Sequence, residues 1–175
     1  MKFGRASVAV FAVVLLLVGC GGEDGPGTVS LYDRAPVPAV PDRTTAVATP
    51  LVDGEYWAEL VSVDAEAGTL TFDLMQALFA DACVEVLGAD GCPNDYGVVD
   101  DPHVEVASPA LALTSASVVA ESQQNYAVTA DELTVLMLGG VPSAGAPDDY
   151  TYVPFPYLVT VANGEVVRAR QIWVP

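Results

Sequence analysis

An acidic stretch in the middle of the chain carries most of the side chains that could bind a metal ion. Residues 88–105 read GADGCPNDYGVVDDPHVE, and carboxylate and amide oxygens are the ligands that Ca²⁺ prefers. The candidate ligands are Asp90, Asn94, Asp95, Asp100 and Asp101, with His103 beside them. The stretch lacks the EF-hand spacing D-x-[DN]-x-[DN]-G, and Asp, Asn, Gly and Pro are also what plain turns require. We therefore predict a long acidic loop, with a calcium site as the alternative.

His103 is the only histidine of the chain and the only obvious candidate for a catalytic base. It could act with Asp95 or Asp101 and a serine from elsewhere as a hydrolase. The chain has no GxSxG, HExxH, Walker A or dinucleotide-binding motif, however. A lone histidine in a loop is more often a surface residue, so we expect no catalytic residues and no cofactor.

The C-terminal region contains the strongest hairpin signal. Asn163-Gly164 stands between two β-rich runs, 157–162 and 165–174, and a type I′ turn needs a positive φ at both central residues. A two-residue loop fixes the register of the strands that it joins. The predicted cross-strand pairs are Val161 with Val166, Val159 with Arg168, and Tyr157 with Arg170.

In that register Arg168 and Arg170 share one face of the hairpin with Tyr157. Arginine binds carboxylates and anions and stacks on aromatic rings. The three residues are thus a candidate site for a small anion or carboxylate, with Arg170 stacked on Tyr157. The simpler interpretation is that both arginines pair with nearby carboxylates.

The N-terminal residues have the organisation of a secretory signal. Lys2 and Arg5 precede an apolar run, 6–18, which is too short for a bilayer core that needs roughly 20 residues. The run ends in Leu17-Val18-Gly19-Cys20. These four residues resemble the lipobox of bacterial lipoproteins. The resemblance implies that residues 1–19 are removed and that Cys20 carries a diacylglycerol; an ordinary signal peptide or an uncleaved anchor is the alternative.

Charge excludes one class of partner. Without Lys2 and Arg5, the chain keeps four arginines and all 23 acidic residues, so its formal charge from Cys20 onward is −19. Nucleic-acid binding needs lysine and arginine against the phosphates, and we exclude it. Anionic lipid headgroups would also repel the domain. The acidity either serves solubility or attracts a small cationic ligand or a basic partner.

Cysteine parity predicts one disulfide. If the lipid occupies Cys20, only Cys83 and Cys92 remain, and two such thiols outside the cytoplasm usually pair. Closing a loop of about ten residues stabilises the fold by roughly 2.5–3 kcal/mol in the chain-entropy estimate. The single histidine and the spacing disfavour a zinc site.

Two segments follow the lipobox. Residues 20–50 are rich in proline, glycine and threonine and predict a disordered tether that holds the domain away from the membrane. Residues 51–175 are long enough to bury one core and predict a single domain.

Alternating strands and short helices make this an α+β domain with an antiparallel sheet. The predicted elements are a hairpin of strands 55–63 and 69–74, a helix 74–87 capped by Asp73 and ended by Gly88, a strand 110–120, a helix 129–138 opened by the capping box Thr129–Glu132, and the C-terminal hairpin.

Three stretches of the domain, LVDGEYWAELVSVD, PNDYGVV and PYLVTVANGEVVRARQIW, together resemble a group of uncharacterised bacterial secreted and lipoprotein domains. The resemblance implies one compact domain and no activity. The sequence thus predicts a lipoprotein on the extracytoplasmic side of the cell membrane, with a non-enzymatic domain that binds an envelope protein. A small-molecule or cation-binding lipoprotein is the alternative, and a hydrolase is the third candidate.

Overall fold

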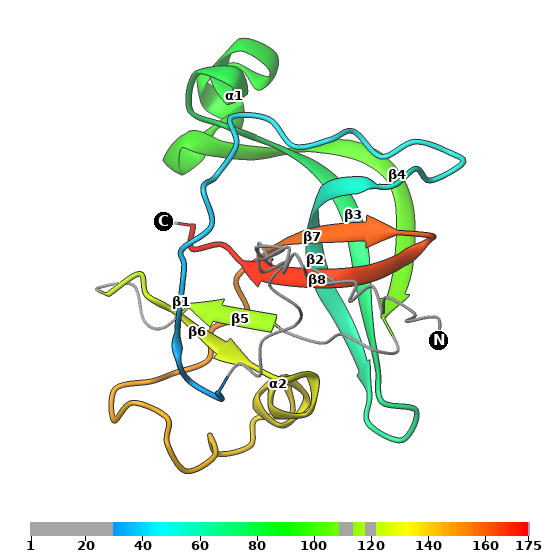
Figure 1. The fold of residues 1–175 in the computed structure, drawn as a ribbon. Helices are drawn as coiled ribbons and strands as arrows, with labels where there is room; N and C mark the ends of the chain where they lie inside the picture. Colours follow the sequence, from blue (N-terminus) through cyan, green and yellow to red (C-terminus); the bar gives the residue numbers. More distant parts are fainter. Residues whose placement is uncertain (1–29, 109–113, 118–121, 175) are drawn as a thin grey trace, which may run out of the picture.

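Eight strands form one sheet in the order β1-β6-β5-β8-β7-β2-β3-β4 (Figure 1). The structure, a computed structural model, describes residues 30–108, 114–117 and 122–174, and only the backbone of 100, 101 and 114–117. The strands are β1 (Arg34–Ala35), β2 (Gly54–Asp64), β3 (Thr69–Phe79), β4 (Tyr96–Ser108), β5 (Thr114–Ser117), β6 (Asn125–Val128), β7 (Tyr157–Ala162) and β8 (Glu165–Gln171). The helices are α1 (Ala80–Leu87) and α2 (Ala130–Met137), and two single 3₁₀ turns cover Ala89–Gly91 and Pro93–Asp95. The predicted α+β class with an antiparallel sheet and two helices is confirmed, with one parallel pair, β5 with β8.

The sheet curls until its end approaches its middle. Strands β8, β7, β2, β3 and β4 wrap around one core, and the Ser108 hydroxyl at the end of β4 donates to the Val166 carbonyl of β8 at 2.6 Å. Figure 1 shows α1 and α2 at opposite ends of the molecule. The inward face of the curled sheet is apolar because alternate residues of each strand point to it. Phe72 and Tyr157, both fully buried, meet there edge to face at 5.7 Å.

The N-terminal hairpin of the domain is confirmed, but its second strand is longer than predicted. The Asp64 carboxylate accepts hydrogen bonds from two backbone amides of the turn, and Gly68 takes the positive φ that closes it. Strand β3 continues to Phe79, so the predicted helix 74–87 is wrong over its first six residues. Asp73 caps no helix; it lies within β3 opposite Glu59 of β2. The helix ends at Gly88, as predicted.

The predicted acidic loop 88–105 is a loop only as far as residue 95. From Tyr96 the chain forms β4, which pairs with β3 along its whole length apart from one irregularity. The alternation of Val104, Glu105 and Val106 fits a strand with one buried face, and paired neighbours outweigh the turn-forming composition.

Cys83 and Cys92 form the predicted disulfide, with 5.9 Å between their Cα atoms. The bond joins α1 to the loop before β4, and both cysteines are buried with Leu78. Gly97 belongs to this contact, because a Cβ there would stand 2.6 Å from the Leu87 side chain. The α1 end is therefore closed covalently.

The predicted tether 20–50 is wrong for its described part, residues 30–50. Tyr32, Thr44 and Val47 are buried, and β1 pairs with β6. The Thr44 hydroxyl accepts from the Ala77 backbone N–H at 2.6 Å. Figure 1 shows this segment running along one side of the molecule from β6 towards α1 before it enters β2. Proline prevents it from joining the sheet over most of its length, but its few apolar side chains still find buried places.

The region before α2 differs from prediction in one element. Of the predicted strand 110–120, β5 is described and the residues on both sides of it lie outside the described ones. Strand β6, with four buried residues, was not predicted. Helix α2 begins as expected: the Thr129 hydroxyl accepts from the Glu132 backbone N–H at 3.2 Å. The Glu132 side chain, however, is not used in the capping box.

Candidate functional site

A bulge in the C-terminal hairpin separates the predicted arginine–tyrosine site. The Asn163-Gly164 turn and the pair Val161–Val166 are as predicted, but the register shifts by one residue beyond Thr160. As a result Tyr157 faces Gln171 and points to the core, whereas Arg168 and Arg170 point outward. The predicted stacking of Arg170 on Tyr157 is therefore wrong, because a bulge exchanges the faces of all later residues.

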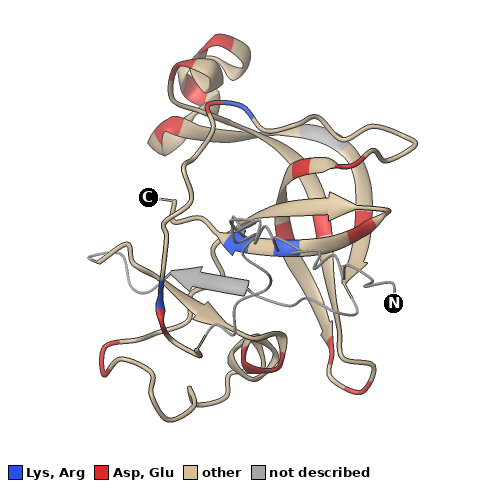
Figure 2. Ribbon diagram, viewed as in Figure 1, with Lys and Arg blue, Asp and Glu red and all other residues tan. Residues whose placement is uncertain are grey.

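Arg170 instead forms an ion pair on the outer surface. Its guanidinium donates to the Glu55 carboxylate of β2 at 2.5 Å. Arg168 is exposed and has no ion-pair partner among the residues described. Between these arginines and the segment 35–39 lies a small pocket of about 220 Å³. Figure 2 shows two basic positions on β8, whereas acidic positions are spread over the helices, the loops and the strands of the domain.

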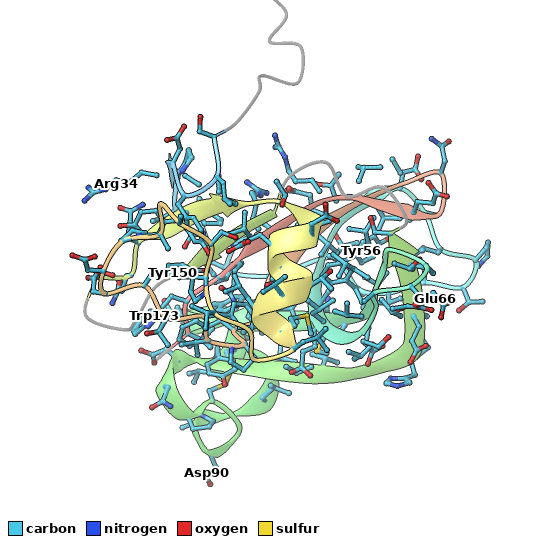
Figure 3. The ribbon with its side chains drawn as sticks, turned by 90° about the horizontal axis from the view of Figure 1, so that it is seen from below. Arg34, Tyr56, Glu66, Asp90, Tyr150 and Trp173 are labelled. Carbon is cyan, nitrogen blue, oxygen red and sulfur yellow. A yellow bond between two sulfur atoms is a disulfide. The ribbon has the colours of Figure 1, made fainter. Side chains whose placement is uncertain are left out.

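A buried carboxylate joins three distant parts of the chain at the other end. Glu132 of α2 accepts from the Tyr32 hydroxyl at 2.5 Å, and from the backbone N–H and hydroxyl of Ser143 at 2.8 and 2.5 Å. Tyr150 packs edge to face on Tyr32 at 4.9 Å and on Tyr126 at 5.9 Å. Figure 3 shows Tyr150 beside α2. We call these five residues the tyrosine–carboxylate cluster.

Hydrogen bonding decides the charge state of this cluster. Burial alone would raise the pKa of Glu132, but the three hydrogen bonds from Ser143 and Tyr32 outweigh it and hold the pKa below its ordinary value. Burial and the neighbouring carboxylate raise the pKa of the Tyr32 hydroxyl, and burial likewise raises that of Tyr150. At neutral pH the cluster is one carboxylate held by neutral donors, which is a structural arrangement.

A cavity of about 410 Å³ lies near this cluster. Its lining combines one carboxylate, three aromatic rings and several apolar side chains: Glu59, Leu60, Met137, Tyr152, Pro154, Phe155, Pro156 and Tyr157. Met137 is the last residue of α2, and Glu59 and Leu60 belong to β2. We call it the aromatic cavity.

The wall of the aromatic cavity is fixed to the sheet by hydrogen bonds. The Gln171 side chain, fully buried at the end of β8, donates to the carbonyls of Val153 and Phe155 at 2.6 and 3.0 Å. The Ile172 backbone N–H donates to the Pro156 carbonyl at 2.8 Å. Prolines on both sides of Phe155 restrict φ further. The cavity is therefore preformed, and a ligand would lose little free energy in ordering it.

Two hydroxyls meet at the cavity. Those of Tyr152 and Tyr157 lie 3.5 Å apart. Burial raises the pKa of both phenols, so both are neutral at physiological pH. Tyr157 is fully buried, so the lining offers the Tyr152 hydroxyl, the rings of Tyr152 and Phe155 and the Glu59 carboxylate, and it contains no basic side chain. This set suits binding, and it contains no histidine, serine or cysteine that would serve as base or nucleophile.

The predicted catalytic base has a partner other than the two expected. His103 lies 2.8 Å through Nδ1 from Asp73 of β3. The side chain of Asp101, one of the two expected partners, lies outside the described residues. The His103 side chain is 78 % exposed, whereas that of Asp73 is 10 % exposed. Within the described part of the chain His103 contacts no serine hydroxyl by a hydrogen bond. The pair holds an imidazole on the surface of β4.

Three acids lie side by side across the sheet at this point. Register places Glu59 of β2 opposite Asp73 of β3, and Asp73 opposite Glu105 of β4. Directly opposed like charges are unfavourable, and His103 is the group that approaches the central one. This acid row begins at the edge of the aromatic cavity, because Glu59 belongs to both.

The predicted calcium ligands do not share one loop. Asp90, Asn94 and Asp95 lie on the two 3₁₀ turns after α1, whereas Asp100 and Asp101 belong to β4. The side chains of Asp100 and Asp101 lie outside the described residues. Elsewhere in the described part, no three His, Cys, Asp or Glu side chains gather as metal ligands.

Comparison with known proteins finds no match: no family model, no curated protein and no solved structure is significantly similar to this chain. In the residues that the structure describes, no helix is both long and apolar enough to cross a membrane.

Of the lining residues of the aromatic cavity, only Tyr157 was singled out from the sequence, and for another site. The signal that could have found the others is the run DDYTYVPFPY, residues 148–157, which holds four aromatic residues and two prolines. Such density is unusual for a plain loop, where polar turn formers predominate.

Proposed function

We propose that this chain is a lipoprotein acylated at Cys20 that carries a non-enzymatic binding domain on the extracytoplasmic side of the membrane. The lipobox residues Leu17-Val18-Gly19-Cys20 support the anchor. The disulfide supports an oxidising compartment, because such bonds persist outside the cytoplasm. Two or more acyl chains are enough for permanent membrane residence.

The position of residue 30 limits how far the domain can stand from its anchor. Ten residue-to-residue steps join Cys20 to residue 30, the first described residue, and ten extended steps reach about 35 Å at most. Tyr32 is bound to Glu132 of α2. Under this proposal the chain that leads from the anchor therefore enters the domain at its α2 end.

The aromatic cavity carries the binding part of the proposal. Its volume lies within the range of small-molecule sites, its lining combines apolar and aromatic side chains with polar groups in similar proportion, and its wall is held by hydrogen bonds. We therefore favour the binding of a small molecule over that of a protein partner on a flat acidic surface.

The anchor is tested by metabolic labelling with an alkyne fatty acid in the native host. We expect the wild-type protein to be labelled and to sediment with membranes, and Cys20→Ser to be unlabelled and released or misprocessed. A Cys20→Ser protein that stays membrane-bound at the normal mature mass would contradict the anchor.

The cavity is tested with a fragment library on the lipidated protein extracted from the membrane in detergent. Ligand-observed NMR should find fragments that bind the wild type and are lost in Met137→Trp, which fills the cavity from its rim. Val135→Trp, on an exposed position of the same helix, is the matched control. Fragments that bind Met137→Trp as tightly as they bind the wild type would place the binding site elsewhere and contradict the proposal.

A further inference from the structure

We infer that the aromatic cavity selects a free organic cation, an ammonium group attached to a small apolar body. The inference deepens the proposed binding function and uses the same site. Its argument is the distribution of charge and aromatic rings around that cavity.

The only charged group of the lining is a carboxylate without a counter-ion. Glu59 is exposed at the cavity and has no ion-pair partner in the described part of the chain, whereas Glu55, four residues earlier on β2, is neutralised by Arg170. Asp73 and Glu105 continue the negative charge away from Glu59 across the sheet. A cation entering the cavity would therefore meet uncompensated negative charge.

The other walls suit a cation that carries apolar groups. The faces of aromatic rings attract ammonium groups, and the partly exposed Tyr152 and Phe155 supply two rings, whereas Tyr157 is fully buried and presents no exposed face. Leu60 and Met137 supply apolar contact. The hydroxyls of Tyr152 and Tyr157 remain neutral, so they neither repel an anion nor replace Glu59 as the charge-selecting group.

The size of the cavity excludes an inorganic ion as its natural occupant. About 410 Å³ is far more than one metal ion needs, and no cluster of three potential metal ligands occurs among the described residues. A body of several heavy atoms is required to displace water from the rings and to bury apolar area.

Three probes test the preference: two share nearly the same shape and differ in charge, and the third adds an anionic group. Choline carries a trimethylammonium group, 3,3-dimethyl-1-butanol is its neutral isostere, and phosphocholine adds a phosphate, as in a lipid headgroup. We expect choline to bind about tenfold more tightly than the alcohol, as a cation–π and charge contact allows. Phosphocholine should bind more weakly than choline because the acid row repels its phosphate.

Matched variants test whether the preference for choline over the neutral alcohol arises in the aromatic cavity. Glu59→Gln keeps the shape and should weaken choline about three- to fivefold, the size of a partly exposed charge contact, without changing the alcohol. Glu66→Gln makes the same change of net charge in the exposed β2–β3 turn and should change neither. Tyr152→Leu should weaken choline more than Tyr152→Phe, which keeps the ring.

The outcomes are distinct. If choline and the alcohol bind equally tightly, or if Glu59→Gln and Glu66→Gln lose the same affinity for choline, selection by charge is contradicted. The proposed binding cavity would then still stand. Phosphocholine that binds as tightly as choline overturns the free-cation assignment. If none of the three probes binds, while fragments still bind in a manner sensitive to Met137→Trp, the inference fails and the proposed function stands.

Discussion

The two ends of this domain fix a short helix to a sheet by different chemistry. Helix α1 is held by a disulfide between Cys83 and Cys92, whose surroundings are small and apolar. Helix α2 is held by the tyrosine–carboxylate cluster, in which Glu132 receives three hydrogen bonds from two distant segments. Each helix has only eight residues, too few to be stable alone in water.

This difference determines how the stability of each end responds to pH. A disulfide acts chiefly on the unfolded chain and does not titrate, whereas a buried carboxylate that takes up a proton loses its charge and becomes a weaker hydrogen-bond acceptor. The aromatic cavity lies at the α2 end, beside the residues whose attachment depends on hydrogen bonds. Its own wall is fixed separately through Gln171, so the cavity should persist when the cluster is weakened.

The largest effect should come from removing the disulfide. Cys83→Ala with Cys92→Ala should lower the free energy of unfolding by roughly 3 kcal/mol, because the unfolded chain regains the freedom of the closed loop. Urea unfolding at pH 7 and pH 4 measures it. We expect nearly the same loss at both values, and a loss confined to one of them would break the comparison.

The α2 end should lose somewhat less from a single substitution. Glu132→Gln keeps the size of the side chain but removes the charge that strengthens its three hydrogen bonds, so the free energy of unfolding at pH 7 should fall by about 2 kcal/mol. Asp131→Asn, the exposed neighbour in the same turn of α2, is the control and should cost less than about 0.5 kcal/mol. Equal losses of unfolding free energy in Glu132→Gln and Asp131→Asn would show that the buried carboxylate stabilises the fold no more than an exposed one.

Acid should sharpen the contrast between the ends. The pKa of Glu132 in the folded protein lies below the ordinary value of 4.5, so the unfolded chain takes up this proton first as the pH falls. The stabilisation is therefore complete above about pH 4.5 and is lost as the pH falls through the folded pKa. In that pH window, the urea-unfolding midpoints of the wild type and Glu132→Gln should approach each other. The difference in midpoint between the wild type and the cysteine variant should stay constant.

Sequence patterns predicted what depends on neighbours in the chain. The Asn163-Gly164 turn, the Asp64 turn, the Thr129 cap and the Cys83–Cys92 pair all follow from local chemistry. What failed depends on distant partners. β4 is a strand because β3 lies beside it, and residues 30–50 are ordered because Tyr32 and Thr44 reach Glu132 and Ala77.

The candidate site shows the same limit at a single residue. The correctly predicted turn implied that Arg170 and Tyr157 share one face, and the one extra residue of an unforeseen bulge was enough to separate them. Glu59 is an ordinary exposed acid in the sequence of its strand. Only the approach of the loop 152–157, which contributes most of the lining, makes it part of a cavity.

We expect the smallest effect from removing the hydroxyl of either of two neighbouring tyrosines, Tyr32 and Tyr150. Tyr32→Phe removes the donor to Glu132 and should lower the free energy of unfolding by about 1 kcal/mol, whereas Tyr150→Phe removes a buried hydroxyl that has no hydrogen-bond partner among the described residues. The second change should be neutral or slightly stabilising, because it relieves an unsatisfied polar group. Both variants keep the aromatic ring and its edge-to-face packing at 4.9 Å, so the comparison isolates the hydroxyl group.

Hydrogen exchange of backbone amides provides a second measurement. It should increase around β1 and β6 in Tyr32→Phe alone, since β1 begins two residues after Tyr32 and pairs with β6. Equal losses in both variants would mean that ring packing, and not the carboxylate, holds the N-terminal segment to the α2 end.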